Sequence, residues 1–203
     1  MICDRKDLHF YIHEDAWRND IKYITILDRL KYLIKVVAGC ENACAFRYLK
    51  CLRHMEFHLN NSPKIYHKLF YYYYKFKIKR LGIRYKIQIM PNICGYGIRL
   101  LHLSGGGGIL LNAKKIGNYC GFNAGVMLGN VGNQENRVTV GDYVAFGPGA
   151  KAFGKINIGN NVFVAPNAVV TKDVPSNCII GGISAKYIKK YESPILKKID
   201  NDK

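Results

Sequence analysis

The amino-acid sequence predicts a mainly β protein, a parallel β-helix preceded by an α-helical region. Residues 140–174 place an apolar residue at every sixth position, a period that fits neither a helix nor a lone strand. Residues 1–85 instead place apolar residues at spacings of three and four, which are typical of helices. We therefore divide the chain into a helical domain at 1–85, a β-helix domain at 86–190 and a C-terminal tail at 191–203.

The helical region contains three predicted segments. The first covers 21–37, with Asp20 as its N-cap and Gly39 at its end. The second covers 41–60, where Ala45, Leu49, Leu52, Met55 and Leu59 share one face. The third covers 64–81 and contains four consecutive tyrosines, which favour a strand, but its basic residues and helical neighbours favour a helix. We predict a helix there.

The six-residue repeat predicts short strands separated by turns. The first position of each unit is always apolar, and so is the fifth. The first-position residues are Val140, Phe146, Ala152, Ile158, Val164 and Val170, and the fifth-position residues are Val144, Ala150, Ile156, Val162, Ala168 and Val174. One unit cannot bury its own apolar side, so the units must stack into a solenoid. The same phase extends upstream through Ile116, Phe122 and Leu128, and the polar run 128–139 is predicted to protrude as a loop.

Charge and length limit the classes of function. The chain has 203 residues and a net charge of +17, and no Asp or Glu occurs between Glu56 and Glu135. The basic residues crowd into 64–86, which favours contact with a polyanion such as nucleic acid, anionic lipid or a phosphate-bearing ligand. No long apolar run or apolar N-terminal signal region is present, so we expect a cytoplasmic protein.

The seven cysteines do not form a recognisable framework. Their number is odd and their spacing irregular, so we expect no disulfide scaffold. Cys40, Cys44, Cys51, His54 and His58 lie close enough in sequence to raise the question of a zinc site. The paired C-x-x-C spacing that is typical of structural zinc sites is missing there. We predict no metal.

The repeat half resembles the hexapeptide-repeat acyltransferases, and most closely the serine acetyltransferases and their relatives in bacterial polysaccharide clusters. The resemblance rests on the stretches ICGYGIRLLH, NAGVMLGN, INIGNNVFVAPNAVVTKDVPSN and GGISAKYIKK. It implies a left-handed parallel β-helix of three hexads per turn, a homotrimer that could pair into a dimer of trimers, and acetyl-CoA as the acyl donor. A γ-type carbonic anhydrase shares this solenoid but needs three histidines on zinc, and the repeat half has only His102.

The resemblance makes His102 the general base. The segment GIRLLH matches the place where serine acetyltransferases carry their catalytic histidine, and an imidazole suits proton removal from a hydroxyl at neutral pH. Two departures argue against free serine as acceptor. Leu101 stands where the family usually has Asp, and Asn136 and Arg137 stand where a second histidine is usual.

The resemblance also implies a binding path for the donor along a groove between chains. Small-residue turns would hold the pantetheine arm, and basic residues would meet the phosphates. The matching positions are Gly129, Gly147, Pro148, Ala165 and Pro166 for the arm, and Lys172 and Lys186 for the phosphates. Asn130 and Arg137 are the candidate acceptor-binding residues.

Taken as a whole, the sequence predicts an acetyl-CoA-dependent O-acetyltransferase that acts on a sugar hydroxyl in surface polysaccharide biosynthesis. The first alternative is a serine O-acetyltransferase of cysteine biosynthesis. A further alternative is a non-catalytic protein whose basic segment 64–86 binds a membrane surface or nucleic acid. We expect a small-molecule or saccharide acceptor and a peripheral contact at the inner face of the membrane, and no nucleic-acid partner.

Overall fold

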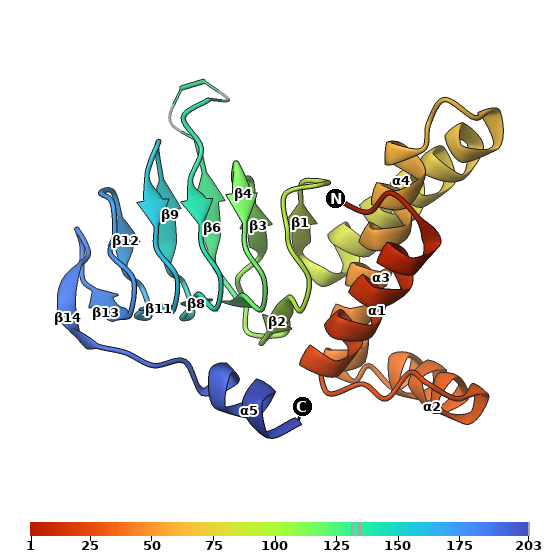
Figure 1. The fold of residues 1–203 in the computed structure, drawn as a ribbon, viewed down its shortest axis with the longest axis horizontal. Coiled ribbons are helices and arrows are strands. Elements are labelled where there is room, and N and C mark those ends of the chain that lie inside the picture. The colour runs from red at the N-terminus through yellow and green to blue at the C-terminus, as the bar shows by residue number, and fades with distance from the viewer. Residues whose placement is uncertain (131, 134, 203) are drawn as a thin grey trace.

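The structure is a computed structural model that describes residues 1–130, 132–133 and 135–202. Four helices precede the strands and one follows them: α1 Arg5–Arg18, α2 Ile26–Val37, α3 Glu41–Asn60, α4 Ile65–Tyr85 and α5 Pro194–Asp202. The strands are β1 Ile87–Ile89, β2 Arg99–Leu101, β3 Ile109–Leu111, β4 Lys115–Ile116, β5 Gly121–Asn123, β6 Met127–Gly129, β7 Thr139–Val140, β8 Ala145–Phe146, β9 Lys151–Phe153, β10 Asn157–Ile158, β11 Val162–Val164, β12 Val169–Val170, β13 Cys178–Gly181 and β14 Lys186–Lys190. Figure 1 shows α1–α4 gathered at one end of a row of stacked strands, with α5 beneath that row.

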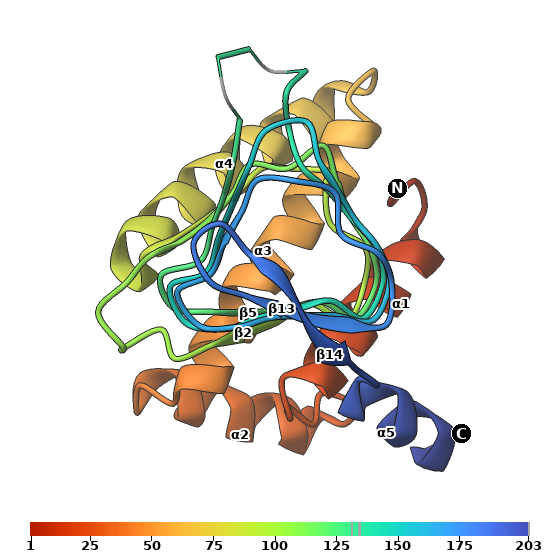
Figure 2. The ribbon, with the colours of Figure 1, turned by 90° about the vertical axis from the view of Figure 1, so that its left-hand side faces the viewer.

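The strands form three sheets that wind into a solenoid. The first sheet has the order β1-β3-β6-β9-β12, the second β10-β7-β4 and the third β14-β13-β11-β8-β5-β2. The chain visits the three sheets in turn, and Phe146 of β8 pairs in parallel with Val164 of β11, one coil later. Figure 2, along the solenoid axis, shows these coils superposed as a triangle. The predicted parallel β-helix with N-terminal helices is confirmed.

The solenoid interior contains the apolar positions of the hexad. The twelve residues predicted from 140–174 are all buried, and so are Ile116, Phe122 and Leu128 upstream. Phe122 and Phe146 stack inside adjacent coils with ring centroids 5.4 Å apart. The repeat buries these residues because the chain turns a corner after each hexad, so the same position of every hexad points into the solenoid.

The predicted loop lies between β6 and β7. It projects from the coil (Figure 1), and Asn130 and Arg137 form an antiparallel bridge at its base. Residues 131 and 134 within it are outside the described residues. The strands on either side keep the hexad phase, because Leu128 and Val140 are both buried.

The three predicted helical segments are helical, but the first begins at Ile26 and not at residue 21, and helix α1 was not among them. Helix α3 covers 41–60 as predicted, and the tyrosine-rich segment is helical in α4. The N-cap of α2 is Thr25, whose side chain forms a capping box with Asp28, so the prediction of Asp20 is wrong. Asp20 instead follows the end of α1 with a positive φ of 57°. Gly39 follows the C-cap of α2 with φ 74°, as its predicted role requires.

The helices close the N-terminal end of the solenoid through a buried ionic network. Arg53 of α3 is fully buried, and its Nε lies 2.8 Å from Asp15 Oδ2 while its Nη1 lies 3.0 Å from Glu56 Oε2. The same guanidinium donates to the carbonyl oxygens of Cys94 and Gly95 in the first coil. The helical region and the first coil are therefore joined by one set of buried hydrogen bonds.

The C-terminal segment returns toward the helices. Strand β14 runs antiparallel to β13 at the far end of the solenoid, and the chain then crosses back to α5. Lys198 of α5 lies 3.4 Å from Asp20 and above the ring of Trp17. This helix lies within the predicted tail at 191–203, for which no helix was expected.

Candidate active site

His102 lies on an exposed corner of the first complete coil. It directly follows β2, has a left-handed φ of 57°, and begins the turn that leads through four glycines to β3. Its own carbonyl accepts a hydrogen bond from the Gly105 N–H at 2.9 Å, which closes the turn. The imidazole is therefore on the outer surface, where an acceptor can reach it, and it does not face the solenoid core.

The corner that carries His102 continues along the solenoid as a ridge of small residues. The N–H of Gly125 donates to Gly108, that of Gly149 to Ala124 and that of Asn167 to Pro148, so successive turns stack directly. A Cβ on Gly107 would lie 2.6 Å from the Gly125 Cα, which leaves no room for a side chain. We name the turns 102–108, 124–126, 147–150 and 165–168 the corner ridge.

Four of the predicted donor-binding residues lie on the corner ridge with His102. Gly147 and Pro148 follow β8, and Ala165 and Pro166 follow β11. Both prolines are exposed, and a Cβ on Gly147 would lie 2.7 Å from the Pro166 nitrogen. At these turns the ridge therefore consists of backbone and of small or proline side chains.

The other predicted residues lie elsewhere on the chain. Gly129 is the last residue of β6, and Asn130 and Arg137 lie at the base of the loop after it. Lys172 follows β12 of the same sheet, so these four residues occupy the next edge of the prism. Lys186 lies on β14, beside Gly181. A single chain therefore does not bring the predicted set into one place.

The helical region holds both ends of the segment that carries His102 through two contacts that no sequence pattern predicts. Asn19 Nδ2 donates to the Ile98 carbonyl at 2.8 Å, just before β2. After the histidine, the backbone N–H of Ser104 donates to Glu41 Oε1 at 3.0 Å. These partners are distant in sequence and carry no local pattern, so only the folded chain reveals them.

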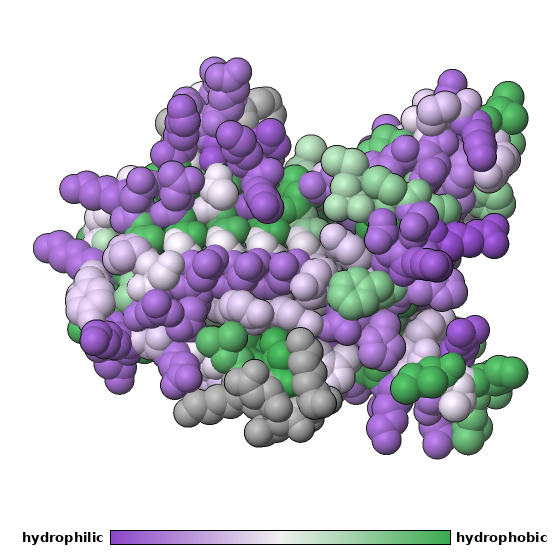
Figure 3. All heavy atoms as spheres, viewed as in Figure 1, coloured by the Kyte–Doolittle hydropathy of each residue, from purple (hydrophilic) through white to green (hydrophobic). Residues whose placement is uncertain are grey.

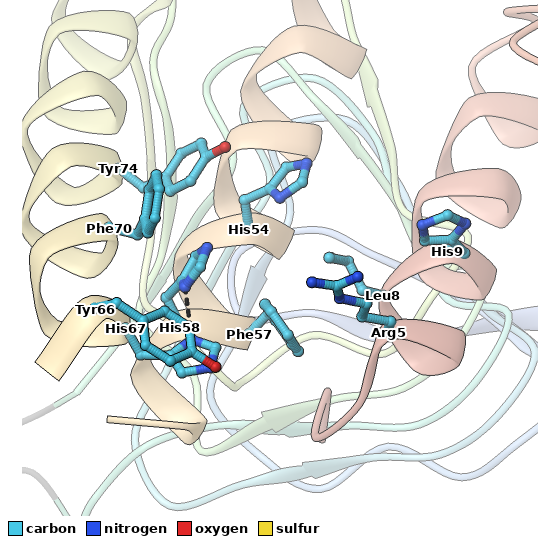
Figure 4. Close-up of a pocket in the computed structure, with 10 residues that line it drawn as sticks. All are labelled: Arg5, Leu8, His9, His54, Phe57, His58, Tyr66, His67, Phe70 and Tyr74. Atoms are coloured by element: carbon cyan, nitrogen blue, oxygen red, sulfur yellow. Dashed lines mark hydrogen bonds between the residues drawn. The ribbon is translucent and has the colours of Figure 1, made fainter. Parts of the chain in front are cut away.

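A separate pocket lies between α1, α3 and α4, away from the corner ridge. It has a volume of about 430 Å³, and Figure 4 shows Arg5 and four histidines among its lining residues. His58 Nδ1 lies 2.8 Å from His67 Nδ1, and His54 stacks on Tyr74. Burial lowers the pKa of His54 to about 4, so this imidazole is neutral at physiological pH.

The cysteine-rich part of α3 does not assemble a metal site. Cys40 is exposed while Cys44 and Cys51 are buried. Burial raises the pKa of the Cys51 thiol to about 11, which opposes metal binding by a thiolate. Over the described residues, no group of three or more His, Cys, Asp or Glu side chains is arranged to hold a metal ion.

Comparison with known proteins shows which proteins this chain resembles in sequence. The chain is 38% identical over 105 residues to a serine acetyltransferase of Synechococcus elongatus, a match that covers 50% of this chain and 42% of the relative. This chain is related to the serine acetyltransferases. It is also 30% identical over 175 residues to serine acetyltransferase 2 of Arabidopsis thaliana, which covers 82% of this chain and 53% of that relative. The chain thus spans about half the length of these relatives, and no protein-family model matches it.

Solved serine acetyltransferases share the fold. The Neisseria gonorrhoeae enzyme aligns with a TM-score of 0.63 at 19% identity and covers 96% of this chain and 70% of that one. The Brucella abortus enzyme in complex with coenzyme A aligns with a TM-score of 0.66 at 21% identity, over 93% of this chain and 70% of its own. The fold resemblance to serine acetyltransferases therefore extends through the helical region.

Proposed function

We propose that this serine acetyltransferase relative is an acetyl-CoA-dependent O-acetyltransferase with His102 as its general base. The imidazole takes the proton from an acceptor hydroxyl as that oxygen attacks the thioester carbonyl carbon. The C–S bond then breaks, and the imidazolium returns the proton to the departing thiolate. Such a base contributes on the order of 10²–10⁴ in rate.

The observation that carries this proposal is the position of His102. The imidazole is exposed at the start of the corner ridge, and the ridge offers backbone and small side chains on which an extended pantetheine arm fits. Pro148, Ala165 and Pro166 are accessible on that surface, whereas Gly147 is buried beneath it and shapes the turn. The match to relatives that are named serine acetyltransferases supports the same chemistry.

We propose further that the donor lies between two chains of a homotrimer. The residues assigned to the donor and acceptor occupy two different edges of the prism, with Gly129 and Lys172 on the edge that lacks His102. One edge facing the other edge of a neighbouring copy would unite them. Lys172 and Lys186 are exposed and would meet the coenzyme's phosphates, and Asn130 and Arg137 would then approach the acceptor from the neighbour.

L-Serine is the acceptor that the relatives support, in place of the sugar that the sequence analysis preferred. The sugar hydroxyl stays as a second candidate because of two local features. Leu101, beside His102, supplies no carboxylate. After the loop, Asn136, Arg137 and the fully buried Val138 occupy the place where the resemblance leads us to expect a second histidine. The cytoplasmic location and the peripheral membrane contact also remain proposals.

Thiol release from acetyl-CoA tests the function. The parent should release thiol with L-serine or with one of a panel of sugars, and His102→Ala should lower kcat by about 10²-fold or more. His54→Ala is the matched control, because His54 lies in the α1–α3–α4 pocket. Activity of His102→Ala within a few-fold of the parent would remove the base assignment, and turnover with serine alone would exclude the sugar.

A further inference from the structure

Helix α4 has an exposed apolar stripe opposite the face that packs in the protein. Its buried residues His67, Ile78 and Leu81 face the rest of the helical region. On the other side, large apolar residues recur at spacings of three, four and seven. They are Ile65, Leu69, Tyr72, Tyr73, Phe76 and Ile83, and each is at least 54% exposed. We name these six residues the α4 stripe.

Cations flank the α4 stripe on both sides. Lys68, Lys75 and Lys79 fall on one flank of the helix by their spacing, and Arg80 and Arg84 fall on the other. All five are exposed, and no acidic residue occurs in the helix. Long basic side chains beside an apolar surface can bury their methylene stems while they extend their charges to a polar layer. Arg80 already lies against the Phe76 ring, with 5.8 Å between guanidinium carbon and ring centroid.

We infer that α4 docks this protein on the surface of an anionic phospholipid membrane. Aliphatic and aromatic side chains of the stripe enter the boundary between headgroups and acyl chains, where tyrosine is favoured, and the flanking cations meet lipid phosphates. The helix has 21 residues, or about 31 Å at the usual rise, so it lies along the surface. None of the helices among the described residues is both long and apolar enough to cross a bilayer.

The charge pattern favours a membrane over the other possible occupants. A second copy of α4 would bring its own lysines and arginines against those of the first, with no carboxylate on either helix to compensate. A nucleic acid would meet the cations but would leave the aliphatic residues Ile65, Leu69 and Ile83 exposed to water. An anionic lipid surface satisfies both parts of the face, the apolar stripe and its charged margins.

Helix α2 provides an internal comparison. It also exposes apolar residues, such as Leu30 and Leu33, and it carries three cations, but unlike α4 it has an acidic residue, Asp28, in its first turn. Figure 3 shows apolar side chains gathered at the lower right, where Figure 1 places α2. Substitutions there remove a similar amount of exposed apolar area and leave α4 unchanged.

Vesicle sedimentation tests the proposal with the full chain. The protein should bind vesicles of phosphatidylcholine mixed with phosphatidylglycerol at low salt, bind those of phosphatidylcholine alone much more weakly, and be released by high salt. Combining Lys68→Gln, Lys75→Gln and Lys79→Gln should weaken binding roughly 100-fold, since each cation near such a surface is worth about fivefold. Equal binding to both kinds of vesicle, or no binding to either, would overturn the assignment.

A second set of variants tests the apolar stripe. Leu69→Ser with Phe76→Ser should lower binding about tenfold or more, whereas Leu30→Ser with Leu33→Ser in α2 should stay within about twofold of the parent. Equal losses from both pairs would remove α4 as the docking helix. The variant with Leu69→Ser and Phe76→Ser could instead bind vesicles as tightly as the parent, with single-stranded RNA displacing both proteins from the vesicles. In that case the surface is a general polyanion site and the membrane proposal is wrong.

Tryptophan fluorescence tests whether the α4 stripe itself enters the membrane, without relying on a variant that binds vesicles less tightly. The chain has one tryptophan, Trp17, so Phe76→Trp in a Trp17→Phe background reports from the stripe alone. Anionic vesicles should shift its emission to the blue, and brominated lipid should quench it. An unshifted spectrum on vesicles that sediment with the protein would place the contact elsewhere.

Discussion

Replacing Arg53 with methionine removes the only cation in the buried network between the helical region and the first coil that the structure describes. Asp15 and Glu56 would then stay buried, at 0% and 2% exposure, without a counter-charge. Removing one partner of a buried ion pair costs about 3–5 kcal/mol, and here two carboxylates and the Cys94 carbonyl lose the same partner. We expect the free energy of unfolding to fall by at least the lower figure.

The pH dependence of the loss separates a charge effect from a packing effect. Burial raises the pKa of Asp15 and of Glu56, and the Arg53 guanidinium opposes both shifts. Without it, both pKa values rise further above those of the unfolded chain. A raised carboxyl pKa favours folding at low pH and loses that benefit as pH rises, so the deficit of Arg53→Met should be large at neutral pH and smaller in mild acid.

Urea unfolding followed by circular dichroism at neutral and mildly acidic pH measures this effect. Arg29→Met, on the exposed side of α2, is the matched control and should change the free energy of unfolding by less than about 0.5 kcal/mol. Combining Asp15→Asn, Arg53→Met and Glu56→Gln should recover much of the loss, because no buried charge remains. A deficit for Arg53→Met below about 1 kcal/mol, or one that does not shrink in acid, would refute the reasoning.

Three further changes have expected outcomes that follow from packing and burial. Phe146→Ala, which removes the ring stacked on Phe122, should cost about 3–5 kcal/mol in urea unfolding, and a loss under 1 kcal/mol would contradict the tight interior. Gly107→Ala places a Cβ 2.6 Å from Gly125, so the melting temperature should fall and acetyl transfer should weaken, while unchanged values would show that the corner ridge can yield. Because burial lowers the pKa of His54 to about 4, stability should decline as pH falls from about 6.5 toward 4, by about 2–3 kcal/mol from this group. His54→Gln should remove that part of the decline, and parallel pH profiles for variant and parent would argue against it.

The solenoid was predictable because its determinants are local and periodic. Val140 and Phe146 are buried for the same reason, since each coil repeats one environment at a fixed interval. The hexad therefore predicts inward positions without knowledge of distant contacts. The N-cap of α2 was harder to predict from the sequence. Asp20 and Thr25 are both good capping residues, and only the path of the chain after α1 selects Thr25.

The candidate site was predictable only in part. His102 stands in a recognisable segment, so sequence resemblance selects it as a candidate, and its role as general base stays a proposal. Asn19 and Glu41, which hold the backbone on either side of it, act across the interface between the helices and the coil. Similarly, the spacing on α4 predicts a helix but does not tell which of its faces packs inward, because apolar residues occur on both sides.

Strand β14 has a consequence for how long the solenoid can become. A stack of parallel coils presents unpaired backbone groups at its last rung, where another chain could add by strand pairing. Here the chain reverses, and β14 pairs antiparallel with β13 across that rung. Lys186, Lys189 and Lys190 are exposed along it, and charged edges of this kind resist further pairing. Deleting the residues from 182 onward would uncover β13, so we expect two shortened chains to pair end to end at this rung, while the helices that close the other end of the solenoid limit that growth to a dimer.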